Sequence, residues 1–258
     1  MRCALCTVLI SSEMDSRSVL PNETRQPKEL AGSLPEDVVP LASSEGQRRL
    51  DECSADNGEG QSPSQYSSIG PCFRKQAGSK FCGVASTAIV FSSLPGCDRV
   101  EEAQVFSLYE DGGKGKPGAP GPQTVEAAGV TLDELHKMAS SIPQLQPAAS
   151  FYSEEMGGDG VDELRAVICR ALSRGGERVL LNYHMSTLGQ TPFGGHVSPV
   201  AAYHRPSDSF LIMDTWPQTE PVWAPARRIW EATTHVDKSS NRSRGLVVTG
   251  FRRERRPP

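Results

Sequence analysis

The chain has 258 residues, of which 37% are hydrophobic, and a formal net charge of -4 at pH 7. This length and apolar content are enough for one sizeable packed domain. The slightly negative charge argues against nucleic acid as a partner, because proteins that bind it present a basic surface. Every apolar run falls short of the roughly 18 residues that a membrane-spanning helix needs, so we expect no membrane partner.

The seven cysteines are odd in number and have no regular spacing, which argues against a secreted fold held by disulfides. We therefore expect a reducing, cytoplasmic location; an N-terminal organelle-targeting segment is the alternative. Cys3 and Cys6 form a single CxxC, which is a weak signal for metal binding or redox chemistry. The oligomeric state has no signature in the sequence.

Composition divides the chain into three parts. Residues 1–69 are rich in Ser, Glu, Pro, Gln and Gly and poor in aromatic residues, so we predict a disordered leader that buries too little apolar surface to offset the entropy of ordering. The packed domain is predicted over residues 70–252, and residues 253–258 form a basic tail. Within the domain, Gly112–Gln123 is rich in Gly and Pro and is predicted to be a mobile loop.

The first predicted helix of this domain carries a cysteine in its first turn. Pro95-Gly96 ends the helix, and its buried face is formed by apolar residues at helical spacing, namely Phe81, Val84, Ala85, Ala88 and Ile89. Cys82 lies where backbone N–H groups are unpaired and the helix dipole is positive, which favours the thiolate and lowers the pKa of the thiol. Cys82 is thus a candidate nucleophile; the alternative is a small apolar core residue.

The remaining pattern changes from helical to extended along the chain. Helices are predicted over Thr131–Ser140, which opens with a TxxE capping box, and over Val161–Ser173, with Cys169 on its apolar side. Strands are predicted at Arg178–Tyr183, Val197–Tyr203, Phe210–Asp214 and Leu246–Thr249. A helical half followed by antiparallel strands indicates the α+β class.

One histidine differs from the other histidines of the chain. His196 follows two glycines and opens the strand VSPVAAY, which turns back as FLIMD and returns Asp214 to the same end of the hairpin. A bulge would bring the two side chains within cross-strand reach; the alternative for Asp214 is a strand-end cap. Three other histidines are expected at the surface: His136, His204 and His235.

Together, these residues predict a papain-like Cys-His-Asp site, in which a helical half carries the nucleophile and a sheet half carries its base. A cysteine nucleophile needs a base and a group that orients the base, and Cys82, His196 and Asp214 occur in that order. Gln76, six residues before Cys82, is the candidate oxyanion donor, together with the Cys82 backbone N–H.

These features resemble the phytochelatin synthase family, the glutathione γ-glutamylcysteinyltransferases, over about Cys72 to Phe251. The motifs that carry the resemblance follow Gln76 in order: FCGVAST, GVTLDEL, QTPFGGHVSPVAAYH, FLIMD, PVW, IWEA and SRGLVV. The resemblance implies a papain-like fold, glutathione as substrate and a γ-glutamylcysteinyl thioester on Cys82, with His196 as base and acid, Asp214 as its orienter and Gln76 as oxyanion donor. It further implies no tightly bound cofactor, heavy-metal ions such as Cd or Zn as activators or as metal-thiolate glutathione, and a role in metal detoxification.

Two departures from the family pattern affect the expected binding of a second glutathione, which would accept the γ-glutamylcysteinyl group. Met185 stands where an arginine is common, and DTWPQTEP replaces a segment that usually carries basic residues; such cations would bind substrate carboxylates. The sequence contains no counterpart of the cysteine-rich second domain of plant members. A glutathione hydrolase that releases γ-glutamylcysteine is therefore the first alternative, an inactive binding or regulatory protein the second, and a generic papain-like peptidase the third.

Overall fold

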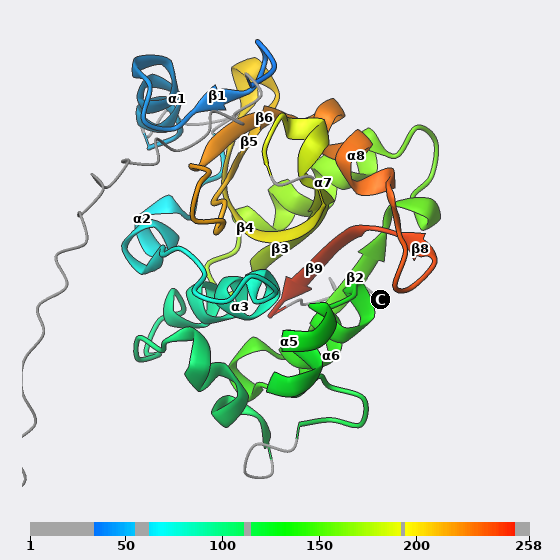
Figure 1. Ribbon diagram of the computed structural model, residues 1–258. Helices are drawn as coiled ribbons and strands as arrows, with labels where there is room; N and C mark the ends of the chain where they lie inside the picture. The colour runs from blue at the N-terminus through cyan, green and yellow to red at the C-terminus, as the bar shows by residue number, and fades with distance from the viewer. Residues whose placement is uncertain (1–33, 55–61, 111–114, 192–193, 251–258) are drawn as a thin grey trace, which may run out of the picture. The chain divides into compact units, whose positions relative to one another are not determined.

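The computed structural model describes residues 34–54, 62–110, 115–191 and 194–250, all within the unit Ala31–Pro258. Their centre is an antiparallel sheet with the strand order β1-β6-β5-β4-β3-β9-β2 (Figure 1). Its strands are β1 (Val39–Pro40), β2 (Ala149–Tyr152), β3 (Arg178–His184), β4 (Gly195–His204), β5 (Ser209–Ile212), β6 (Val222–Pro225) and β9 (Gly245–Thr249). A separate hairpin pairs β7 (Val236–Asp237) with β8 (Arg242–Ser243).

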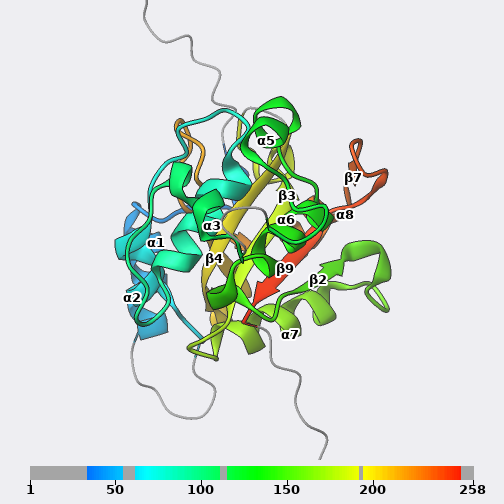
Figure 2. The same cartoon turned by 90° about the horizontal axis from the view of Figure 1, so that it is seen from below.

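Helices cover both faces of this sheet. On one face lie α1 (Ser44–Ser54), α2 (Tyr66–Ile69), α3 (Cys82–Ser92), α5 (Pro122–Ala128) and α6 (Leu132–Ser140); on the other lie α7 (Val161–Leu172) and α8 (Ala226–Thr234). Figure 2 shows α3 and α7 on opposite sides of the central strands. Short 3₁₀ turns complete the chain: η1 (Gly70–Cys72), η2 (Glu102–Leu108), η3 (Pro143–Leu145), η4 (Ser153–Glu155), η5 (Met185–Leu188) and η6 (Arg205–Ser207).

The predicted α+β class is confirmed, and its elements lie close to their expected bounds. The capping box is present, because the Thr131 side chain accepts from the Glu134 N–H while the Glu134 carboxylate accepts from the Thr131 N–H. The strand Val197–Tyr203 lies within β4, and Asp214 follows the end of β5. The sequence analysis did not predict β2, β6, α5 or α8.

Helix α3 differs from its prediction, since it is buried all round and not only along one face. Every residue from Gly83 to Ser92 is buried, because α3 lies between the sheet and the segment η2 to α6. Its hydroxyl residues tolerate this burial by hydrogen bonding: Ser86 Oγ donates to the Val197 carbonyl at 2.9 Å, and Thr87 Oγ1 donates to the Gly83 carbonyl at 2.7 Å. The apolar spacing therefore indicated a helix but did not indicate that the helix is buried on all sides.

The prediction of a disordered leader over residues 1–69 is wrong for its described parts. Strand β1 pairs with β6 at the edge of the sheet, and α1 presents Leu50 and Cys53 to a buried cluster that includes Ala201 and Trp223. The buried positions of α1 are few, so the polar composition around them concealed an amphipathic helix. Residues 1–33, with Cys3 and Cys6, and the predicted tail 253–258 lie outside the described residues, as does the start of the predicted mobile loop.

His204 was expected at the surface, and this is also wrong. It is 1% exposed, with Nε2 at 2.8 Å from Glu52 Oε2 of α1 and Nδ1 at 2.7 Å from Ser207 Oγ. Its ring lies edge-on to Trp223. The imidazole thus connects α1 to the β4–β5 hairpin, a contact between segments far apart in the chain.

Candidate active site

Cys82 is the first residue of α3, as the sequence predicted, and Phe81 is its N-cap. Burial of the side chain raises the pKa of the thiol, but a hydrogen bond and the charge of His196 and the N–H groups of Val197 and Gly83 outweigh this, so the pKa lies below its ordinary value. The Gly83 N–H is free to stabilise a thiolate because the first turn of a helix has no carbonyl to bind it, and the Val197 N–H comes from strand β4.

The hairpin of β4 and β5 brings His196 next to Asp214. The register shifts between Val200 and Ala202, so the expected bulge is present and the two side chains meet across the strands. His196 Nε2 lies 2.9 Å from Asp214 Oδ1, and the Trp216 backbone N–H donates to the same oxygen at 2.8 Å. With Nε2 on the carboxylate, Nδ1 is the ring nitrogen that remains for the thiol.

The surroundings favour a protonated His196. Burial alone would lower the pKa of the imidazole, but the hydrogen bonds and charges of Asp214 and Cys82 raise it to about 9. Since the pKa of Cys82 moves down and that of His196 moves up, the pair favours a thiolate and an imidazolium near neutral pH. The Trp216 ring lies edge-on to the imidazole, at 6.5 Å between centroids, and limits the access of water to it.

Gln76 is buried beside the same residues. Its backbone N–H donates to the Thr215 carbonyl at 2.8 Å, and its Oε1 accepts from Thr215 Oγ1 at 3.2 Å. One N–H of its amide donates to the Gly78 carbonyl at 2.8 Å. A primary amide has a second N–H, so Gln76 can still donate to a substrate.

A cavity of about 550 Å³ opens over Cys82 and His196. The charged residues that line it are Lys80, Glu134, Asp237 and Arg244, and Asn182, Met185 and Trp216 line it as well. Arg244 is 8% exposed; its Nη1 donates to Asn182 Oδ1 at 2.9 Å and lies 3.8 Å from Asp237 Oδ2. Its Nε has no hydrogen-bond partner among the described residues.

Gly195 is required for the position of this arginine. A Cβ at residue 195 would lie 2.2 Å from Arg244 Nη1, so any other residue would displace the guanidinium. Of the two glycines that precede His196, Gly195 is the one that the Arg244 guanidinium approaches closely. Two other arginines, Arg227 and Arg228, form ion pairs with Asp159 and Asp37.

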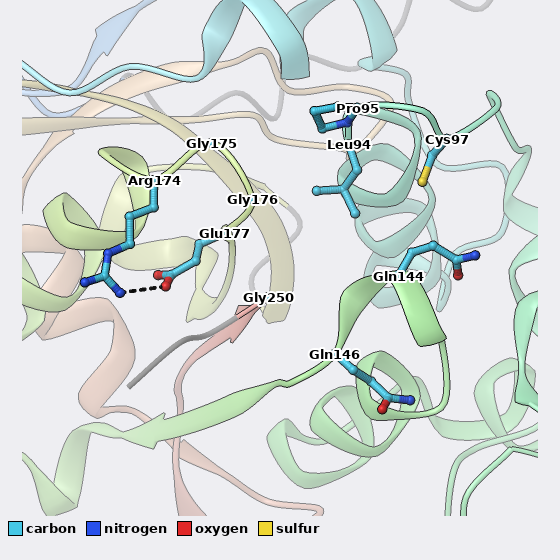
Figure 3. A pocket seen from close by; sticks show the side chains of 10 residues that line it. All are labelled: Leu94, Pro95, Cys97, Gln144, Gln146, Arg174, Gly175, Gly176, Glu177 and Gly250. Carbon is cyan, nitrogen blue, oxygen red and sulfur yellow. Dashed lines mark hydrogen bonds and ion pairs between the residues drawn. The ribbon is translucent and has the colours of Figure 1, made fainter. Parts of the chain in front are cut away.

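A larger hollow of about 820 Å³ lies elsewhere, lined by Leu94, Cys97, Arg174 and Glu177 among others (Figure 3). It contains an ion pair of 3.0 Å between Arg174 and Glu177. Burial and then Asp98 raise the pKa of its cysteine, Cys97, so this thiol is not activated. Burial likewise raises the pKa of Cys53 to about 11 and that of Cys169 to about 12.

Metal binding and membrane insertion find no support in the described ranges. No group of three or more His, Cys, Asp or Glu side chains is placed there to hold a metal ion. The helices from residue 34 to residue 250 include none with the length and apolar character to span a bilayer.

The fold and the cavity define an α+β protein with an activated thiol, and comparison with known proteins identifies its family. The family model described as phytochelatin synthase matches residues 30–246. Glutathione gamma-glutamylcysteinyltransferase 1 of Lotus japonicus is 26% identical over 220 residues, which are 82% of this chain and 40% of that protein. The protein of the same name from Triticum aestivum is 26% identical over 83% of this chain and 41% of its own length.

The chain therefore belongs to the phytochelatin synthase family. It spans about 40% of the length of these curated relatives. The match begins at residue 30, ahead of β1 and α1, so the part of the predicted leader that packs on the sheet lies within the region that the family model matches.

Proposed function

We propose that this protein is a γ-glutamylcysteinyltransferase that acts on glutathione through a thioester on Cys82. The observation that carries the proposal is the pairing of a thiol of lowered pKa with a histidine whose pKa is raised to about 9, next to the buried Asp214. This electrostatic pattern is that of a cysteine nucleophile with its base. A papain-like arrangement is part of the proposal, supported by a nucleophile on α3 and a base on β4.

Acylation begins with attack of the Cys82 thiolate on the carbonyl carbon of the Cys–Gly amide of glutathione. A C–S bond forms and the C–N bond breaks; His196 gives its proton to the departing glycine amine, and Asp214 stabilises the imidazolium. The Cys82 backbone N–H and the second N–H of Gln76 would stabilise the oxyanion. Gln76 is hydrogen-bonded to Thr215, the residue after Asp214. This contact fixes the position of the oxyanion donor relative to Asp214 and therefore to the base, His196.

Transfer then requires an acceptor amine. The α-amine of a second glutathione attacks the thioester carbonyl, His196 takes the amine proton, and Cys82 leaves as a thiolate. If water attacks instead, the product is γ-glutamylcysteine. We expect heavy-metal ions such as Cd or Zn to act as the thiolate complex of glutathione, and we propose no tightly bound cofactor.

Arg244 and Asp237 suit the γ-glutamyl end of glutathione. That end carries an α-carboxylate and an α-ammonium on one carbon, and the cavity offers a buried cation and an anion 3.8 Å apart. Arg244 lines the cavity, and a guanidinium can bind a carboxylate through two parallel N–H groups. This pair therefore would hold the donor with its scissile amide toward Cys82.

Hydrolysis is the second candidate outcome. Met185 is 2% exposed and lines the cavity without offering a charge, and Lys80 and Arg244 are the lysine and arginine side chains among its described lining residues. With one of them assigned to the donor, few cations remain for a second glutathione. An inactive binding protein is disfavoured, because it has no need of an activated thiol.

The decisive experiment is to incubate the purified chain with glutathione, with and without a cadmium salt, and to identify the thiol products and released glycine by mass. Wild-type protein should release glycine, and Cys82→Ser should not. Cys97→Ser is the matched control, because Cys97 lines the other hollow and its pKa is raised. Glycine release at the wild-type rate by Cys82→Ser would overturn the mechanism.

A further inference from the structure

A cluster of buried polar side chains lies directly behind His196 and Asp214. Tyr183 is the residue opposite His196 in the pairing of β3 with β4, and its ring lies edge-on to the imidazole at 5.7 Å between centroids. Its hydroxyl lies 3.3 Å from Gln190 Oε1 and 3.4 Å from Ser198 Oγ. All these side chains are at most 3% exposed, so water has little access to their polar atoms.

When Tyr183 donates to Gln190, some buried polar atoms of this cluster are left without a hydrogen-bond partner. Two buried atoms then have no partner among the described residues, the carboxylate oxygen Asp214 Oδ2 and the amide nitrogen Gln190 Nε2. A buried carboxylate oxygen without a donor is costly. Meanwhile the single proton of Tyr183 goes to a neutral amide, although an ionised carboxylate is the stronger acceptor.

The negative charge of Asp214 acts on the Tyr183 hydroxyl. Burial, and then the Asp214 carboxylate, raise the pKa of the Tyr183 hydroxyl well above its ordinary value. Rotation of the Gln190 amide by a half turn would direct Nε2 to the Tyr183 oxygen. The hydroxyl proton would then be free for Asp214 Oδ2, and both unpartnered atoms would have a partner, at the expense of one amide oxygen.

We propose that Tyr183 is a positioning residue that donates its hydroxyl proton to Asp214 Oδ2. The proposal rests on the function assigned above to Asp214. The two carboxylate oxygens then have separate partners, with Oδ1 bound by His196 and the Trp216 N–H and Oδ2 bound by Tyr183. By drawing negative charge away from Oδ1, the hydroxyl limits how strongly Asp214 holds the proton on His196.

Removal of the hydroxyl should therefore raise the pKa of His196. The orientation of the carboxylate persists in Tyr183→Phe, because the Trp216 N–H still binds Oδ1 at 2.8 Å. The charged groups that face His196 are Cys82 from α3 and Asp214 after β5, and neither is altered. Only a part of the effect of one charged hydrogen bond to Asp214 reaches His196, so an upward shift of about half a pH unit or more is expected.

The test is the rate of alkylation of Cys82 by iodoacetamide in the full chain as a function of pH, quantified by mass at the Cys82 peptide. The alkaline step of this profile reports loss of the His196 proton and should lie at higher pH in Tyr183→Phe than in wild type. Tyr203→Phe is the matched control, because its hydroxyl donates to a different carboxylate, Asp208 Oδ1, at 2.8 Å. Its alkaline step should coincide with that of wild type.

An alkaline step in Tyr183→Phe that coincides with wild type, or that lies lower, overturns the proposal. Should Tyr183→Phe not fold, Gln190→Leu gives an independent reading. If the Tyr183 hydroxyl already donates to Asp214, the alkaline step of Gln190→Leu stays at the wild-type pH. A downward shift of this step would show that the Tyr183 hydroxyl had donated to Gln190, which would overturn the proposal. Alkylation needs no glutathione, so absence of glycine release from wild type would refute the transferase and leave this test standing.

Discussion

Arg244 offers the sharpest test of how the cavity recognises glutathione. The substitution Arg244→Gln keeps a polar side chain next to Asn182 but removes the charge that would bind the α-carboxylate of the γ-glutamyl group. A hydrogen bond to a charged group contributes about 1.5–3 kcal/mol, which corresponds to about a 10- to 150-fold loss. Since Arg244 is only 8% exposed, solvent should weaken this contact little, and we expect kcat/KM for glycine release to fall within that range.

The assay compares two substrates, glutathione and 4-aminobutanoyl-cysteinyl-glycine, which is glutathione without its α-carboxylate. Wild type should prefer glutathione, and Arg244→Gln should lose that preference, because the two changes remove the same contact and are not additive. Arg242→Gln is the control, since Arg242 pairs with Glu154 and lies 3.3 Å from the ring centroid of Tyr152, apart from the residues that line the cavity. If Arg244→Gln slows both substrates by the same factor, Arg244 does not bind the α-carboxylate.

The remaining predictions concern the pH dependence and the stability of the fold. The pKa of His196 is raised to about 9, so the imidazolium that protonates the glycine amine is present below that pH. Glycine release, measured across about pH 6 to 10, should therefore decline above about pH 9. A rate that keeps rising to the alkaline end would contradict the assignment. Leu50→Ala should lower the free energy of unfolding in urea by about 2–4 kcal/mol, because Leu50 packs α1 against the sheet. The control Arg48→Ala changes an exposed residue of the same helix and should leave the urea midpoint nearly unchanged. An unchanged midpoint for Leu50→Ala would mean that α1 is not docked.

Much of the candidate site was predictable because its signals are local. The helix after Lys80, the glycine before His196 and the return of FLIMD as a hairpin are each encoded within a few residues, and they sufficed to select Cys82, His196 and Asp214 from the other candidates. Gln76 needed only its spacing from Cys82. The α+β class followed in the same way, from the change of apolar period along the chain.

Other features depend on contacts between distant segments, which no local pattern records. Helix α1 has too few apolar residues to be recognised, and only its contacts with Trp223 and Ala201 show that it is part of the fold. The burial of His204 could not be predicted, because its partner, Glu52, lies far away in sequence.

The sequence by itself determined several of the elements, the class of fold and the candidates Cys82, His196 and Asp214, because helical and strand periods and capping boxes act over a few residues. Only the tertiary structure decided what surrounds them. It brought Arg244 and Asp237 to the wall of the cavity and placed Tyr183 of β3 opposite His196 of β4. The shifts of pKa that favour a thiolate on Cys82 are likewise a property of the packed fold, because burial and the distances between charges exist only once the helical half and the sheet are in contact.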